Sequence, residues 1–167
     1  MSLVTDLPAI FDQFSEARQK GFLTVMDLKE RGIPLVGTYC TFMPQEIPMA
    51  AGAVVVSIEE AEKYLPRNLC PLIKSSYGFG KTDKCPYFYF SDLVVGETTC
   101  DGKKKMYEYM AEFKPVHVMQ LPNSVKDDAS RALWKAEMLR LQKTVEERFG
   151  HEISEDALRD AIALKNR

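Results

Sequence analysis

The stretch Ile33-Pro-Leu-Val-Gly-Thr-Tyr-Cys-Thr-Phe-Met-Pro-Gln-Glu46 decides the fold. Its apolar first half predicts a buried strand that carries Cys40 to its carboxyl end. Pro44 suits the first turn of a following helix, which Gly52 would end. A strand followed at once by a helix is the repeating unit of an α/β fold with a parallel sheet.

The same alternation of strand and helix continues along the chain. Further strands are predicted over 53–57, 92–97 and 116–121, and helices over 6–31, 44–51, 58–65, 103–113, 125–149 and 154–165, with another opening at Cys70-Pro71. Gly21 is a candidate break in the first helix, and Asp101 and Ser154 are candidate N-terminal caps. We therefore predict a Rossmann-like or flavodoxin-like three-layer α/β fold. Its parallel sheet has about four strands with flanking helices, and C-terminal helices follow.

Composition narrows the classes of function. The chain has 167 residues, of which 46% are hydrophobic and 28% charged, and its net charge is −2. This balance gives no basic surface for nucleic acid or an anionic membrane. No apolar run approaches the ~20 residues of a transmembrane helix, and residues 1–8 do not resemble a signal peptide. We expect a cytoplasmic protein whose four cysteines stay reduced.

Three of these cysteines lie at boundaries of the predicted strands and helices, at regular spacing along the chain. Cys40 and Cys100 follow strands, Cys70 opens a helix, and each stands 30 positions after the last. Thiolates at the carboxyl edge of a parallel sheet suit a metal or iron–sulfur site. Free cysteines are also common packing residues, and no CxxC pair is present. Spacing alone leaves both interpretations open.

The residues around these cysteines resemble a known family. The stretches Tyr39-Cys-Thr-Phe-Met-Pro-Gln-Glu-Ile-Pro-Met-Ala-Ala-Gly52, Leu69-Cys-Pro-Leu-Ile-Lys-Ser75 and Asp92-Leu-Val-Val-Gly-Glu-Thr-Thr-Cys-Asp-Gly-Lys-Lys-Lys105 are similar to the three cysteine motifs of the 2-hydroxyacyl-CoA dehydratase family. Benzoyl-CoA reductase subunits belong to the same family. The motifs stand in the family's order, which makes the resemblance specific.

The resemblance implies a dehydratase, a lyase of anaerobic metabolism, with a cube-type 4Fe-4S cluster held by Cys40, Cys70 and Cys100. It implies a homo- or heterodimer, a CoA thioester substrate and a separate ATP-dependent iron–sulfur activator protein. It further implies that the activator supplies one electron, that the thioester becomes a ketyl radical anion, and that hydroxide leaves the neighbouring carbon. Glu46 matches the glutamate of the Cys-then-Pro-x-Glu motif, which implies proton handling or orientation. A glutamate there also suits the dipole of a helix N-terminus.

The chain departs from the family in length. Family subunits are about twice as long, so we divide the chain into an N-terminal helical segment (1–32), an α/β cluster-binding domain (33–122) and a helical extension (123–167) leading to an absent second domain. We expect the fragment alone to be inactive, with or without a bound cluster. The connector between Ser57 and Cys70 is also shorter than the family pattern implies. Either the protein has a true deletion here, or a loop has been left out of the given sequence.

Other signals leave alternatives open. Cys85 lies outside the motifs and reads as a structural thiol, or as a ligand of a double-cubane cluster, as in low-potential reductases of the same family. Gly78-Phe-Gly-Lys-Thr82 matches the last part of the P-loop pattern of nucleotide-binding proteins. Ser75 stands where that pattern needs its first glycine. Lys103 to Lys105 suit either CoA phosphates or a solvated face. A non-catalytic partner subunit is a further alternative, and His117 is expected to be a packed core residue.

Overall fold

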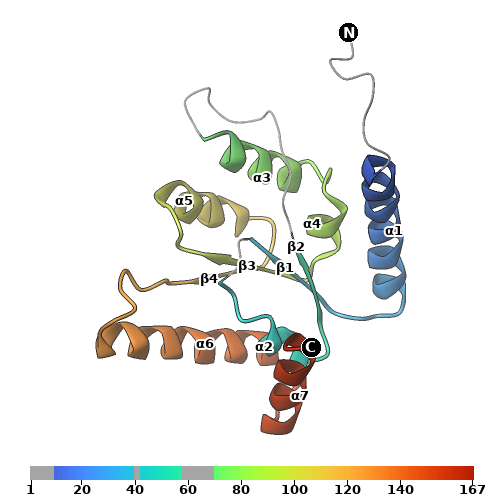
Figure 1. Ribbon diagram of the computed structural model, residues 1–167. Coiled ribbons are helices and arrows are strands. Elements are labelled where there is room, and N and C mark those ends of the chain that lie inside the picture. Colours follow the sequence, from blue (N-terminus) through green and yellow to red (C-terminus); the bar gives the residue numbers. More distant parts are fainter. Residues whose placement is uncertain (1–9, 40–41, 58–69) are drawn as a thin grey trace.

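A four-stranded parallel sheet forms the centre of the computed structural model, which describes residues 10–39, 42–57 and 70–167 (Figure 1). The strands are β1 (Leu35–Thr38), β2 (Val54–Ser57), β3 (Leu93–Glu97) and β4 (Val116–Met119). Their order across the sheet is β2-β1-β3-β4, and every pairing is parallel. The predicted α/β fold is confirmed.

Helices cover both faces of this sheet. They are α1 (Ile10–Glu30), α2 (Glu46–Ala50), α3 (Pro71–Lys81), α4 (Pro86–Phe90), α5 (Asp101–Met110), α6 (Asp128–Phe149) and α7 (Glu155–Lys165). Figure 1 shows α3, α4 and α5 on one face and α2, α6 and α7 on the other. The arrangement is the predicted three-layer architecture. Among the described residues, no helix is both long enough and apolar enough to cross a bilayer.

The strand residues contribute to two separate cores, because successive side chains point to opposite faces of the sheet. The core under α2, α6 and α7 includes Val36, Leu93, Val95, Met119, Leu141, Val145, Ile153 and Ala161. The core under α3, α4 and α5 includes Tyr39, Ile73, Phe88, Val94, Met106, Tyr107 and Met110. The C-terminal helices therefore complete one of the two cores. The division of the chain at residues 32 and 122 stays a prediction.

The helix caps agree with the sequence in most places. Gly52 and Gly150 adopt positive φ angles of 77° and 65° and end α2 and α6, as glycine does at helix ends. The Ser154 hydroxyl accepts a hydrogen bond from the backbone N–H of Ala157 at 3.1 Å and caps α7, as predicted. The cap predicted at Asp101 is wrong, because Cys100 is the N-cap of α5 and Asp101 is its first residue.

Two further expectations about helices need correction. Gly21 does not break the first helix, since α1 is continuous over 21 residues. A Cβ at Gly21 would lie 2.6 Å from the Tyr87 hydroxyl, so this glycine permits α1 to approach α4 closely. The four consecutive aromatic residues at 87–90 belong to the short helix α4, which the sequence does not predict. The helix predicted over 58–65 lies outside the described residues.

Candidate functional site

Two of the three predicted cysteine ligands begin helices. Cys70 is the N-cap of α3 and Cys100 is the N-cap of α5, and both side chains are exposed. Neither side chain accepts a capping hydrogen bond from its helix. Pro71 occupies the first position of α3, where its fixed φ angle and missing N–H favour a helix start. Cys40 lies outside the described residues.

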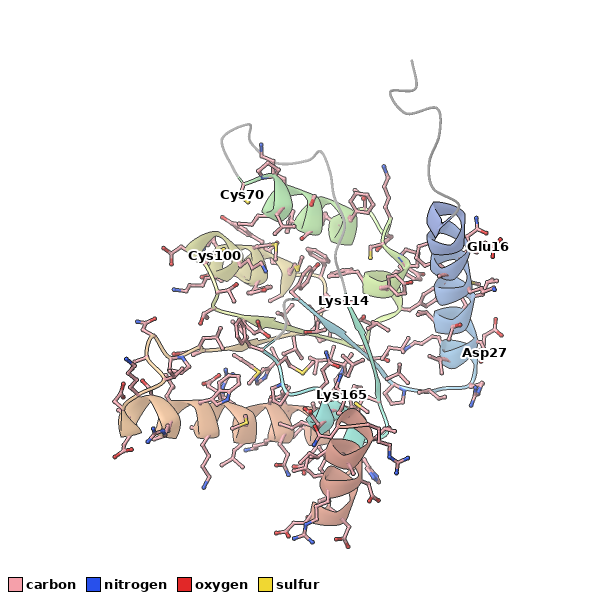
Figure 2. All side chains as sticks on the ribbon, viewed as in Figure 1. Glu16, Asp27, Cys70, Cys100, Lys114 and Lys165 are labelled. Atoms are coloured by element: carbon pink, nitrogen blue, oxygen red, sulfur yellow. The ribbon has the colours of Figure 1, made fainter. Side chains whose placement is uncertain are left out.

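The first turns of α3 and α5 touch. A Cβ added to Gly102 would lie 2.3 Å from Cδ1 of Ile73, so glycine at this position is what permits the approach. Ile73 is three residues after Cys70, and Gly102 is two residues after Cys100. Figure 2 shows both cysteines on the α3 and α5 side of the sheet. The fold thus brings Cys70 and Cys100 to neighbouring helix starts.

This arrangement suits the binding of a soft metal by thiolates. The N-terminus of a helix carries partial positive charge and favours an anionic group. Two exposed thiols beside two such ends are therefore placed to act as thiolate ligands. Within the described ranges, no three His, Cys, Asp or Glu side chains form a metal-binding group. The third predicted ligand, Cys40, is outside those ranges, so the complete ligand set stays a prediction.

A buried carboxylate, which the sequence analysis did not single out, lies at the carboxyl end of β3. Glu97 is 0% exposed, and its Oε1 accepts a hydrogen bond from the backbone N–H of Met43 at 2.5 Å. Burial raises the pKa of Glu97, while the backbone N–H groups of Met43 and Phe42 and the ammonium group of Lys103 oppose that shift. The available sequence signal was a glutamate ending an otherwise apolar strand, Leu93-Val-Val-Gly-Glu97.

Glu46, the predicted proton-handling residue, lies on the other side of the sheet. It is the first residue of α2 and half-buried, and it lines a groove of about 290 Å³ with residues of α6 and α7 such as Lys135, Met138 and Leu158. The described structure does not bring its carboxylate to Cys70 or Cys100. A catalytic role for Glu46 stays a prediction.

Cys85 does not join the two exposed thiols. It is 7% exposed and is the N-cap of α4, where its Sγ accepts a hydrogen bond from the backbone N–H of Phe88 at 3.5 Å. This environment is that of the predicted structural thiol. His117 is likewise a buried core residue, at 5% exposure, as predicted.

The P-loop interpretation of residues 78–82 is wrong. Gly78 to Lys81 form the last turn of α3 and Thr82 is its C-cap, so no strand-to-helix loop is present to surround a phosphate. The run Lys103 to Lys105 is not a uniform solvated face either. Lys103 is 9% exposed, whereas Lys104 and Lys105 make exposed ion pairs with Asp101 and Glu108.

Comparison with known proteins decides the family. Residues 40–167 match the family described as 2-hydroxyglutaryl-CoA dehydratase, D-component. The chain belongs to this family. A relative from Escherichia coli (strain K12), named "Putative dehydratase subunit YjiM", is 94% identical over 175 residues, which cover 100% of this chain and 46% of the relative. The resemblance read from the three cysteine motifs is confirmed.

The chain spans less than half of that curated relative, at 46% of its length. The matched region is 175 residues long and the chain has 167, a difference of eight (175 − 167). This difference agrees with a chain that is shorter than this relative within the matched region. The connector over 58–69, where we expected the shortening, lies outside the described residues.

Proposed function

We propose that this chain forms the cluster-binding part of a 2-hydroxyacyl-CoA dehydratase subunit, with Cys40, Cys70 and Cys100 holding a 4Fe-4S cluster. The observation that carries the proposal is the pair of exposed thiols at two helix starts whose first turns touch. Family membership supports a dehydratase-type subunit. The reaction would remove water from a 2-hydroxyacyl-CoA and leave an enoyl-CoA.

The roles of the protein residues follow from their positions. Cys70 and Cys100 would supply thiolates, and the amide N–H groups at the starts of α3 and α5 would stabilise their negative charge. The hydrogen bond from the backbone N–H of Met43 to Glu97 joins the segment after β1 to the end of β3. When bound, the cluster would supply one-electron transfer and an iron open to an oxygen ligand.

The partners follow from the same proposal. They are a CoA thioester, a second subunit in a homo- or heterodimer and an ATP-dependent iron–sulfur activator that delivers the electron. We place the protein in the cytoplasm, where thiols remain reduced. Since the chain spans 46% of its relative, we expect activity only from a longer protein that contains it.

Iron and sulfide analysis with EPR, under anaerobic conditions on the full-length protein, tests the proposal. We expect about four irons per subunit, and loss of this iron in the variants Cys40→Ser, Cys70→Ser and Cys100→Ser. Cys85→Ala is the matched control and should retain the iron, because its thiol is buried in the cap of α4. A protein that binds no iron, and that the three serine variants leave unchanged, would refute the proposal.

The double-cubane reductase remains the alternative within the same family. It predicts about eight irons per subunit, so the same measurement separates the two functions. The buried position of Cys85 adds no third exposed thiol beside Cys70 and Cys100.

A further inference from the structure

β4 is an edge strand, and half of its backbone groups point away from the sheet. Among the described strands, β3 is its only neighbour. The carbonyl oxygen of Met119 accepts a hydrogen bond from the backbone N–H of Thr98 at 3.0 Å, so Met119 faces β3. Because residues alternate in direction along a parallel pair, Val118 and Gln120 point their N–H and C=O groups away from β3. A further strand could bind to such groups.

An open groove of about 820 Å³ runs beside this edge. Val116, Val118 and Gln120 line it, together with residues of α5 and α6 such as Glu108 and Leu133. These two helices lie on opposite faces of the sheet (Figure 1). A strand added to β4 would lie about 4.8 Å from it, and would therefore enter this groove. The edge is accessible unless side chains close it.

Two side chains of α6 bind the outward backbone groups of β4. Oε2 of Glu137 accepts a hydrogen bond from the backbone N–H of Gln120 at 2.8 Å, and Nη2 of Arg140 donates to the carbonyl oxygen of Val118. Nε of Arg140 also donates to Oε1 of Glu137 at 3.2 Å, so the two side chains hold each other. In a parallel sheet, one residue of the next strand would donate to that carbonyl and accept from that N–H. The guanidinium and the carboxylate take over these two roles.

The burial of Glu137 distinguishes this pair from an ordinary ion pair on a helix. The Glu137 side chain is 8% exposed, whereas Asp128, which pairs with Arg131 at the same spacing on α6, is 99% exposed. Burying a carboxylate costs free energy unless hydrogen bonds and a cation compensate. An apolar residue would pack here at lower cost, but it would leave the edge of β4 open.

We propose that Glu137 and Arg140 close the sheet at β4 against a further strand. Their side chains fill the hydrogen-bonding positions, and the space, that such a strand would take. A second copy of this chain, or the rest of a longer protein that contains it, would then assemble through other surfaces. The inference does not depend on the proposed cluster, so its test needs no metal.

Three variants of the full-length protein separate closure of the edge from loss of charge. Glu137→Ala combined with Arg140→Ala is the open-edge variant, because it frees both positions. Glu137→Gln removes the charge but keeps an oxygen that accepts from Gln120, so the edge should stay closed. Asp128→Ala combined with Arg131→Ala is the matched control, because it removes an acid–arginine pair of the same spacing from the exposed surface of the same helix.

The first readout is the hydrogen exchange of single amides, measured by mass spectrometry with residue-level fragmentation. The Gln120 amide should exchange about tenfold faster in the open-edge variant, the factor expected for the loss of a hydrogen bond. The Leu121 amide, which donates to Oγ1 of Thr98 at 2.9 Å, should keep its rate.

The second readout is the binding of a fluorescent peptide with the sequence of residues 114–121, which contains β4 itself. We expect this peptide to bind the open-edge variant about tenfold more tightly than the wild type, Glu137→Gln and the matched control. Fluorescence anisotropy measures the affinity.

Peptide binding separates closure of the edge from simple anchoring of α6. An unchanged exchange rate at Gln120, or faster exchange without tighter peptide binding, would overturn the proposal. So would equally tight binding to Glu137→Gln or to the matched control, because lost charge would then recruit the peptide. If the open-edge variant does not fold, Arg140→Ala frees the Val118 carbonyl alone. Tighter peptide binding than the wild type would then support closure, and equal binding would refute it.

Discussion

His117, on β4, shows how burial sets the charge of a single side chain. Its Nδ1 lies 2.9 Å from the Thr144 hydroxyl, which itself donates to the carbonyl oxygen of Arg140 at 3.0 Å, so Nδ1–H is the donor to Thr144. Burial, with a smaller contribution from the Arg140 cation, lowers the pKa of His117 to about 4, and Glu137 opposes the shift. The imidazole is therefore neutral at pH 7.

This pKa predicts a loss of stability in acid. The folded form resists protonation of His117, so the unfolded chain gains a proton first as the pH falls from about 6.5 to about 4. The contribution is fully present above pH 6.5 and is lost through that window. Between pH 7 and pH 4.5, the wild type should lose on the order of 2 kcal/mol more than His117→Gln in urea unfolding.

His151 provides the control for this prediction, because its side chain is exposed. His151→Gln should follow the wild-type pH dependence. If His117→Gln also follows it, His117 titrates normally and the assigned environment is wrong.

Gly96 is a second residue whose identity is fixed by its neighbour. A Cβ at this position of β3 would lie 2.3 Å from Cζ of the Tyr107 ring, and Tyr107 is 1% exposed. The ring has no free space to move into, so Gly96→Ala should destabilise the protein by about 1–3 kcal/mol in urea unfolding. Adding Tyr107→Leu should recover part of this loss, and an unchanged cost in the double variant would contradict the assigned contact.

At the scale of elements, Gly102 and Ile73 control how closely α5 approaches α3. The added Cβ of Gly102→Ala would lie 2.3 Å from Ile73 Cδ1 but 3.7 Å from Cγ1. Alanine is favoured over glycine in a helix by about 1 kcal/mol, so the sign of the effect depends on this one methyl group. With Ile73 present, the substitution should cost about 1–3 kcal/mol.

Ile73→Val removes Cδ1 and should reverse the effect. In that background, Gly102→Ala should be neutral or stabilising, and Ile73→Val alone should cost about 0.5–1.5 kcal/mol. A double-mutant cycle in urea measures the coupling between the two sites. A coupling energy near zero would mean that the first turns of α3 and α5 do not touch as described.

The elements themselves were largely readable from the sequence because their signals are local. Pro71, Gly52, Gly150 and Ser154 act within one turn of chain, and each marks the helix boundary that was predicted. The helix α4 was missed because it is only five residues long and lacks an alternation of polar and apolar residues. Gly21 was misread because its reason, the hydroxyl of Tyr87, lies 66 positions away in the chain (87 − 21).

The candidate site was only partly readable for the same reason. Strand order places the ends of β1 and β3 side by side, and the cysteines could be assigned to that edge from the alternation of elements. The contact between the first turns of α3 and α5 depends on Gly102 and Ile73, which have no local pattern. The bond from Met43 to Glu97 joins residues 54 positions apart, so it becomes visible only when the sheet is assembled.

At the scale of the whole molecule, the sheet depends on the C-terminal helices as much as on its own strands. Leu141 on α6 is 0% exposed and packs in the same core as Val36, Val95 and Met119, whereas Leu139 on the same helix is 57% exposed. Leu141→Ala should therefore cost about 2–5 kcal/mol and Leu139→Ala less than about 0.5 kcal/mol. The two variants delete the same atoms, two residues apart, so helix propensity cancels in the comparison.

Urea unfolding followed by two probes tests whether this core and the site belong to one cooperative unit. If they do, Leu141→Ala should lower the midpoint equally for tryptophan fluorescence, which reports Trp134 on α6, and for the alkylation of Cys85, which is buried in the core on the opposite face of the sheet. A shift seen by fluorescence alone would mean that α6 and α7 unfold apart from the sheet. In that case the boundary predicted near residue 122 would separate two folding units. The helices α6 and α7 would then not stabilise α3 and α5, the helices that begin after Cys70 and Cys100.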